Sequence, residues 1–363
     1  MSFVLQTLGN LLYHAVFFTF VMPFLSTLVR YRANHTPKLL QLPEDDNTPP
    51  ADAVVSSYFG IMRLVYRIEV RRCAVGGNAT QQPEQGWAGL YKGVVPALLT
   101  TILAPLLQAP ITMVAAWYEP GSDGQPLSFA MIILITLFFV LLLPLASAIL
   151  LIPMQVITYR AITTSHHLPF RSLKTALSVL LTPLERRRPY LLYLAPGVAA
   201  ANLLLAFSAA LIGLPFQFLI MVLIDPRGQE DTMEKIKQHL AVIIVASVAA
   251  FVLLILFLTP LRLMRVRLAL QRREAPFSEG EPSAEEIQDA PLIISEPVIC
   301  LRNSADSEYG AAPYTSLISC MRHIIREEGW RVLFRGWWIV MLQFLTAPSW
   351  SPGSSSPLFT LLW

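Results

Sequence analysis

The sequence predicts an all-α membrane protein: six transmembrane helices in three pseudo-symmetric two-helix repeats, with short surface helices on the side of the basic loops. Three observations predict this class, namely the low content of charge, the long apolar runs and the motifs that recur along the chain. Only 14% of the 363 residues are charged and 54% are hydrophobic, whereas a soluble chain carries about 25% charged residues. This composition is typical of a protein that lies largely in lipid.

Six segments are predicted to cross the membrane, because a helix of about 20 apolar residues spans the roughly 30 Å hydrocarbon core. They are residues 4–29, 95–117, 129–159, 192–223, 239–267 and 333–347. Residues 1–29 carry no charge, so they fit neither a secretory signal nor a transit peptide, and we expect the first helix to be retained. The sixth segment is the shortest and runs into APSWSPGSSSP.

The basic residues predict the orientation of these helices. Of the 27 Lys and Arg residues, 24 fall on the side of the three long loops, at residues 30–94, 160–191 and 260–332 together with Arg335. The other side holds three. Because Lys and Arg concentrate on the inner side of a membrane protein, both termini are expected on the opposite, less basic face.

One motif occurs twice, in EQGWAGLYKG at residues 84–93 and in EEGWRVLFRG at residues 327–336. Both copies follow the pattern Glu-x-Gly-Trp-x-x-Leu-aromatic-basic-Gly, and the altered stretch LERRRPYLLYLAPG at residues 184–197 takes the middle position. Recurrence over such distances indicates an internal repeat. The chain is accordingly divided into repeats at 1–118, 119–225 and 226–363, the last with a flexible acidic insertion at 274–312.

A second motif, proline followed seven residues later by arginine, closes each odd-numbered helix. It is found at Pro23 and Arg30, at Pro153 and Arg160, and at Pro260 and Arg267. A proline kinks its helix because it removes one backbone hydrogen bond and its ring displaces the preceding carbonyl. Three kinked helices around a pseudo-threefold axis are expected to converge at their basic ends.

Together, the three prolines in register and the two glycine-aromatic motifs resemble the mitochondrial carrier family over the whole chain. The resemblance implies a multi-pass mitochondrial membrane protein that moves a small solute by alternating access, in the inner membrane by the default of the family. An alternative is a carrier-fold scaffold of the outer membrane that no longer transports and acts in mitochondrial fusion, morphology or lipid contact.

The chain departs from the family at its gate, where the family pattern is Pro-x-acid-x-x-base. The acidic positions here hold Leu25, Gln155 and Arg262, and the basic positions hold Leu28, Thr158 and Arg265. No acid remains, so the inter-helix salt-bridge ring that the resemblance implies cannot form. The candidate kink and gate residues are Pro23, Arg30, Pro153, Gln155, Arg160, Pro260, Arg262, Arg265 and Arg267.

The glycine-basic element at the start of the even-numbered helices resembles a cardiolipin site of the family. The candidate lipid-binding residues are Gly89, Lys92, Gly93, Arg335 and Gly336. Helix N-termini attract phosphate, which gives the physical reason; plain interfacial anchoring without a specific lipid is the alternative. The acidic loops and the basic run at residues 185–188 also suit a protein partner, although such runs are often only solvated linkers.

The even-numbered helices lack charge over residues 97–116, 194–224 and 336–347. Ionisable residues in the membrane usually mark a pathway for charged solutes, so a strongly anionic substrate is not expected. The candidate polar residues of the cavity are Thr100, Thr101, Gln108, Asn202, Gln217 and Gln343. Hydrogen bonding between helices is their alternative role.

An enzyme is not expected from this sequence. His166 and His167 would be the best catalytic candidates, but they lie in a loop without a carboxylate or a cysteine at a useful spacing. The spacing of the cysteines fits no metal site. We therefore expect no cofactor, no metal and no nucleic-acid partner.

Overall fold

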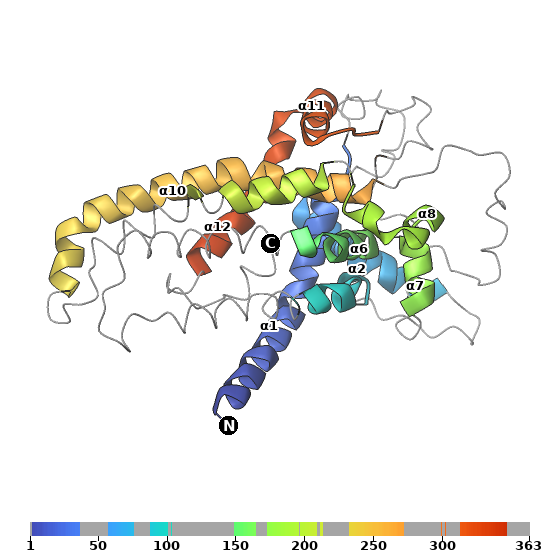
Figure 1. The fold of residues 1–363 in the computed structure, drawn as a ribbon, viewed down its shortest axis with the longest axis horizontal. Coiled ribbons are helices and arrows are strands. Elements are labelled where there is room, and N and C mark those ends of the chain that lie inside the picture. Colours follow the sequence, from blue (N-terminus) through green and yellow to red (C-terminus); the bar gives the residue numbers. More distant parts are fainter. Residues whose placement is uncertain are drawn as a thin grey trace.

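Helices form the regular secondary structure of the computed structural model in the part of the chain that it describes (Figure 1). The described residues are 2–36, 57–75, 88–100, 103, 149–164, 173–195, 197–208, 211–212, 232–271, 299, 302 and 313–346. Within these ranges there is no strand, so the described part of the chain is all-α, as predicted. The predicted repeat boundaries and nearly all of the acidic insertion 274–312 lie outside the described residues.

The elements follow one another as long helices separated by short surface helices. They are α1 (Ser2–Ala33), α2 (Tyr58–Val75), η2 (Ala88–Tyr91), α6 (Ile152–Thr163), α7 (Leu173–Leu180), α8 (Pro183–Arg187), η4 (Pro189–Leu192), α10 (Thr232–Leu270), α11 (Leu317–Glu327), η6 (Trp330–Phe334) and α12 (Trp337–Thr346). Residues 94–100 and Val198–Ser208 are also helical. The predicted spans 95–117, 129–159 and 192–223 extend beyond the described residues, so the arrangement of six spans stays a prediction.

The long helix α10 has the character of a membrane span. Its part from His239 to Leu270 is, among the described helices, the one that is long and apolar enough to cross a membrane. Large apolar side chains between residues 240 and 257 are exposed, including Val245, Val252 and Phe257. An apolar surface of this kind is stable against lipid and unstable against water.

The prolines of the predicted kinks lie in α1, α6 and α10. Pro23 and Pro260 lie inside α1 and α10, whereas Pro153 stands in the first turn of α6. Residues 149–150 are helical and Leu151 forms a turn before α6 begins. The helical regularity is thus interrupted just before Pro153, as expected from the hydrogen bond that a proline cannot make.

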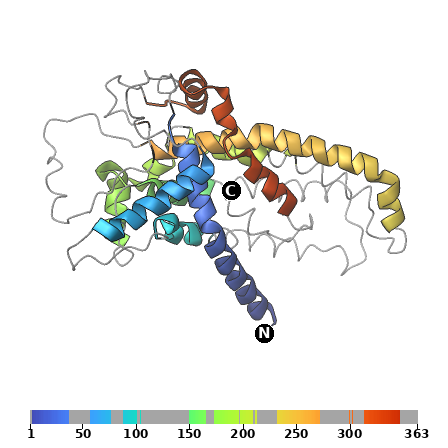
Figure 2. The same ribbon diagram turned by 180° about the vertical axis from the view of Figure 1, so that it is seen from behind.

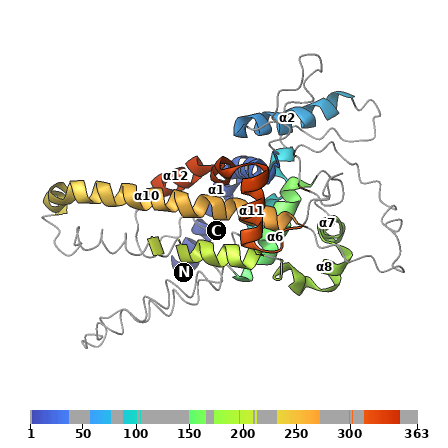
Figure 3. The same cartoon turned by 90° about the horizontal axis from the view of Figure 1, so that it is seen from above.

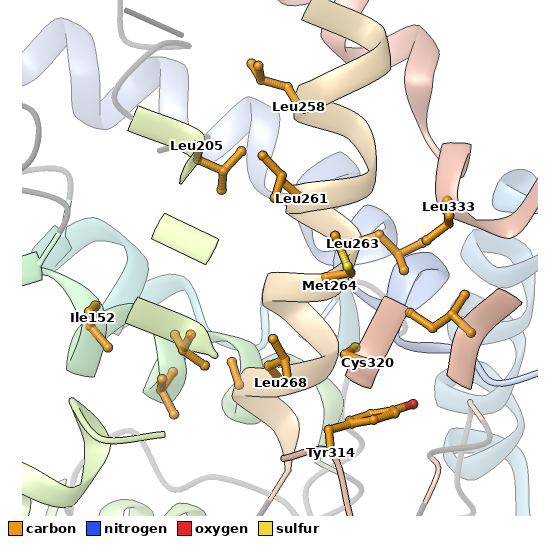
Figure 4. Close-up of a cluster of buried hydrophobic side chains, with 14 of the residues drawn as sticks. Ile152, Leu205, Leu258, Leu261, Leu263, Met264, Leu268, Tyr314, Cys320 and Leu333 are labelled. Atoms are coloured by element: carbon orange, nitrogen blue, oxygen red, sulfur yellow. The ribbon is translucent and has the colours of Figure 1, made fainter. Parts of the chain in front are cut away.

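The C-terminal parts of α1, α6 and α10 pack against one another in pairs, and this packing forms the core (Figure 4). Leu261, Leu263 and Leu268 of α10 lie at its centre. The segment from α11 to η6 contributes Cys320 and Leu333 on one side of α10, while Ile152 and Leu205 lie on the other side. Val156 and Val198 belong to the same core. The helix α10 is therefore the element that joins the parts of the core.

Surface elements surround the end of the molecule at which these three helices terminate. The helix α2 crosses the end of α1 (Figure 2), and the hydroxyl of Tyr58 donates to the carbonyl of Phe24 at 2.9 Å. The helix α12 lies along α10 (Figure 3). On α11, Cys320 and Ile324 are buried while Ile318 and Ile325 are exposed, a pattern that suits a helix lying at a membrane surface.

We predict that Gly197→Ala destabilises this packing. Gly197 has a φ of 79°, and a Cβ placed there would lie 2.8 Å from the backbone nitrogen of Leu317. The left-handed conformation alone costs an L-residue about 1–2 kcal/mol, and the contact with backbone adds to that cost. Thermal unfolding of the purified chain measures the loss of stability.

The matched control is Gly60→Ala in α2, where no positive φ is present. Alanine favours a helix over glycine by about 1 kcal/mol, so this variant should match or exceed the melting temperature of the wild type. Equal melting temperatures for Gly197→Ala and the wild type would contradict the close packing of α11 on residue 197.

Candidate functional site

Three buried arginines, one from each of α1, α6 and α10, connect the ends of these helices. The side-chain Nε atoms donate to backbone carbonyls: Arg30 to Ile162 at 3.1 Å, Arg160 to Ala269 at 3.2 Å, and Arg267 to Arg32 at 3.2 Å. Each acceptor lies two residues beyond the arginine of another helix of the three. The bonds thus run from α1 to α6, from α6 to α10 and from α10 back to α1. We call this set the arginine cycle.

The acceptors of the arginine cycle follow from the geometry of helix ends. Arg32, Ile162 and Ala269 each occupy the last but one position of their helix. The last four carbonyls of an α-helix have no partner within the helix and carry the negative end of its dipole. A guanidinium from a neighbouring helix satisfies such a carbonyl and places its positive charge where the dipole favours it.

Two of these arginines also hold a buried carboxylate with both terminal nitrogens. Arg160 donates Nη1 to Oε2 of Glu185 at 2.6 Å and Nη2 to Oε1 at 3.0 Å. Arg267 donates to both oxygens of Glu328, with Nη2 and Oε2 3.0 Å apart. Arg30 donates Nη2 to the carbonyl of Gly89 at 2.8 Å. Bidentate pairs of arginine and carboxylate fix the relative orientation of the two side chains in addition to neutralising their charges.

Both carboxylates are oriented by further hydrogen bonds from the backbone. The N–H of Thr182 donates to Oε2 of Glu185 at 3.1 Å, and the hydroxyl of Thr182 accepts from the N–H of Glu185 at 3.3 Å. This is the capping box of α8. The N–H of Thr36 donates to Oε2 of Glu328 at 3.1 Å. Segments distant in sequence are thereby attached to the ends of α6 and α10.

The pKa values of these two carboxylates depend on two opposing effects, burial and the arginine partners. Burial by itself raises the pKa of Glu328, but the hydrogen bonds and the charge of Arg267 outweigh it, so that this pKa lies below its ordinary value. For Glu185, burial likewise raises the pKa, and Arg160 and Thr182 lower it further than burial raises it. Both groups are therefore carboxylates at neutral pH.

A second group of arginines lies at the predicted gate. Arg262 and Arg265 of α10 are buried together with Arg32 of α1. Nη1 of Arg265 donates to Oδ1 of Asn202 at 3.2 Å, and Nδ2 of Asn202 donates to Oε1 of Gln155 at 3.1 Å. Two amides thus connect α10 to α6 at the positions where the resemblance implies salt bridges. We refer to Arg32, Arg262 and Arg265 as the gate arginines.

The candidate lipid-binding residues make contacts within the protein. The carbonyl of Gly89 accepts from Arg30, and a Cβ on Gly93 or Gly336 would meet side chains of α6 or α1 at 2.7 Å. Nη1 of Arg335 donates to the carbonyl of Asn34 at 2.7 Å. Lys92 stands in the turn before the helix at residues 94–100. These contacts assign the residues a role in packing, and their role in lipid binding remains a prediction.

The polar residues predicted for the cavity are only partly described. Asn202 belongs to the amide connection with Gln155, and the hydroxyl of Thr100 donates to the carbonyl of Pro96 within its own helix at 2.8 Å. Gln343 lies on α12. Thr101, Gln108 and Gln217 lie outside the described residues, as do His166 and His167 of the enzymatic alternative. The hydrogen bonding of Asn202 matches the alternative role in joining helices.

Sequence reasoning missed three members of the site, namely Arg32, Glu185 and Glu328. Glu328 lies at the second position of the repeated motif, and Glu185 lies in the altered middle stretch. Each precedes a short helix, η6 or η4, that leads to an even-numbered helix. That shared place was the available signal. Arg32 carries no such signal, because a basic residue at the end of a membrane helix is ordinarily solvated. Cys320, by contrast, is a core residue, since burial raises the pKa of its thiol to about 12.

A family model described as "Mitochondrial carrier protein" matches residues 297–351. The matched segment contains α11, η6 and α12, and thus Glu328, Arg335 and Gly336. No curated protein and no solved structure matches the chain.

We predict that Glu328→Gln destabilises the protein far more than Glu327→Gln does. The first change leaves Arg267 buried without its counter-charge, and removing one partner of a buried pair costs about 3–5 kcal/mol. The side chain of Glu327 is 27% exposed and pairs with Arg302 near the surface, where a pair contributes less than about 1 kcal/mol. Thermal or denaturant unfolding of the purified chains at pH 7 measures both effects.

The same variant should change how stability depends on pH. Because the pKa of Glu328 is lowered in the folded state, its contribution is complete above the ordinary carboxyl value of about 4.3 and is lost as the pH falls through the folded-state pKa. The difference between wild type and Glu328→Gln should therefore shrink toward acid pH. A difference that stays constant down to the acid limit of the folded state would count against the Arg267–Glu328 pair.

Proposed function

We propose that the chain is a mitochondrial carrier that moves a small solute across a mitochondrial membrane by alternating access, and the match of residues 297–351 to the mitochondrial carrier model supports this proposal. The proposal includes the arrangement of six spans in three two-helix repeats. It places the protein in the inner membrane, in keeping with the family. The solute that fits the charge-free even-numbered helices is not strongly anionic.

The observation that carries the proposal is the arginine cycle. Alternating access needs a contact that closes one end of the helix bundle and can be broken. The cycle joins three helices through side-chain hydrogen bonds at their C-terminal ends, and the same relation of arginine to acceptor holds at all three contacts. This threefold regularity supports the proposed repeats, because unrelated helices would not reproduce it.

In the proposed transporter, amide side chains take part in closing the gate at positions where an acid–base ring would place ion pairs. Its contacts from α6 to α10 include the amides of Gln155 and Asn202. A neutral hydrogen bond contributes about 0.5–1.5 kcal/mol, compared with about 1.5–3 kcal/mol for one that involves a charged group. The bond from Asn202 to Gln155 is of the neutral kind, whereas the bond from Arg265 to Asn202 involves a charged group, so the first is the weaker of these two closing contacts.

We predict that Pro153→Ala reduces uptake of the transported solute several-fold. The proline stands where helical regularity is interrupted before α6, and alanine would allow the helix to continue straight, which hinders a movement that uses the kink. Uptake is measured in proteoliposomes with a panel of radiolabelled neutral and zwitterionic metabolites. Pro183→Ala is the control, because Pro183 is exposed at the start of α8 and its replacement should leave uptake unchanged.

Two results would contradict this prediction. Unchanged uptake by Pro153→Ala would show that the kink takes no part in transport. Absence of uptake by the wild-type chain for every member of the panel would favour the scaffold alternative over the carrier.

The membrane and the orientation are tested by protease protection of a tag inserted within residues 274–312. In the inner membrane with the basic loops in the matrix, the tag should resist protease both in intact mitochondria and in mitoplasts, and should be cleaved after detergent is added. Cleavage in intact mitochondria would place the loops in the cytosol and the protein in the outer membrane. Cleavage in mitoplasts alone would reverse the proposed orientation.

A further inference from the structure

The gate arginines form an unusual concentration of buried positive charge. Arg32, Arg262 and Arg265 are 3%, 5% and 4% exposed. Arg265 acts electrostatically on Arg32, and both Arg32 and Arg265 act on Arg262. The ring of Tyr159 lies among them, with the guanidinium of Arg265 5.7 Å from its centre. Like charges removed from water repel one another strongly unless negative charge is also present.

Arg32 lacks the partner that a buried guanidinium requires. Its Nε and Nη2 atoms are buried and donate no hydrogen bond, and it forms no salt bridge with any residue that the structure describes. Arg160 and Arg267 differ from it, since each of them holds a carboxylate. A buried donor without an acceptor costs about 1–3 kcal/mol, and more where it is charged. The unused donors of Arg32 therefore point to a ligand that supplies oxygen atoms and negative charge.

The surroundings of Arg32 favour an anion in a second way. The backbone of Gly336 lies so close that a Cβ there would be 3.5 Å from Nη2 and 3.6 Å from Nε of Arg32. The helix α12 begins at the next residue, Trp337. The free N–H groups and the dipole of a helix N-terminus favour negative charge. Arg32 and the N-terminus of α12 thus both favour a negative charge close to Gly336.

We propose that the gate arginines and Tyr159 bind a phosphate-type oxyanion between the basic ends of α1, α6 and α10. The planar guanidinium matches the oxygen atoms of phosphate and binds them two at a time. The oxyanion comes either as inorganic phosphate or as the headgroup of an anionic phospholipid. It is a ligand of the closed end and not the transported solute, so its binding does not depend on the proposed transport.

Such a ligand would provide the negative charge that the gate positions of this chain lack. Bound between Arg32 of α1 and Arg262 and Arg265 of α10, it would convert repulsion between these helices into attraction. The arginine cycle would then be strengthened at the same end of the molecule. The expected result is a closed gate that is more stable with the anion than without it.

The test is the melting temperature of the purified full-length chain in detergent, followed by tryptophan fluorescence during titration with inorganic phosphate at constant ionic strength. Saturable binding should raise the melting temperature by about 2 °C at ten times the Kd. Arg32→Gln should abolish this rise, whereas Arg326→Gln, at an exposed position on α11, should retain it. Direct binding of radiolabelled phosphate to the wild type supplies a second measurement if Arg32→Gln does not fold.

The two sources of the oxyanion are separated by a parallel titration with a short-chain phosphatidylglycerol. If the lipid raises the melting temperature of the wild type but not of Arg32→Gln, and phosphate raises neither, the site binds a lipid headgroup. No Arg32-dependent rise and no binding of either probe would overturn the proposal. It would also be overturned if neutralising the acidic residues of 274–312 lowered the melting temperature and created phosphate binding that was absent before, because the chain itself would then supply the counter-charge.

Discussion

The positions of α1, α6 and α10 relative to one another depend on one constraint: a guanidinium removed from water must find an acceptor for each of its N–H groups. In this chain the acceptors are the carbonyls that a helix leaves unpaired in its last turn. The side chain of Arg267 reaches the last turn of α1, and the other two arginines reach α6 and α10 in the same manner. Each helix end is therefore both a donor to one neighbour and an acceptor from the other.

This constraint also explains how the surface segments are held. Once Arg160 and Arg267 are buried, their charge requires compensation, and Glu185 and Glu328 bring it from segments outside the long helices. The compensation is uneven, because Arg32 receives no such carboxylate from the described part of the chain. In the described part of the chain, the end at which α1, α6 and α10 are joined therefore also contains a buried guanidinium, that of Arg32, whose Nε and Nη2 have no acceptor.

The sequence predicted the general features and missed the specific contacts for a physical reason. Low charge and apolar runs predicted the all-α, membrane-type chain, and the spacing of proline and arginine singled out Arg30, Arg160 and Arg267. The acceptors of these arginines could not be predicted from the sequence, because they are backbone carbonyls and every residue has one. Glu185 was hidden within a charged run that is equally typical of a solvated surface. The burial of Arg32 depends on the close approach of Gly336, which no local pattern reveals.

The distribution of polar contacts along α10 bears on how the molecule can move. Between residues 240 and 257 this helix exposes apolar side chains, such as Val245 and Val252, and lipid offers these surfaces no directional bonds. Near its C-terminal end, hydrogen bonds join α10 to other helices at Arg265, Arg267 and Ala269. Separating the ends of α1, α6 and α10 requires several guanidinium groups to lose their acceptors together. Any separation of these ends is for that reason a cooperative event, to which the charges of Arg32, Arg262 and Arg265 at the same end contribute.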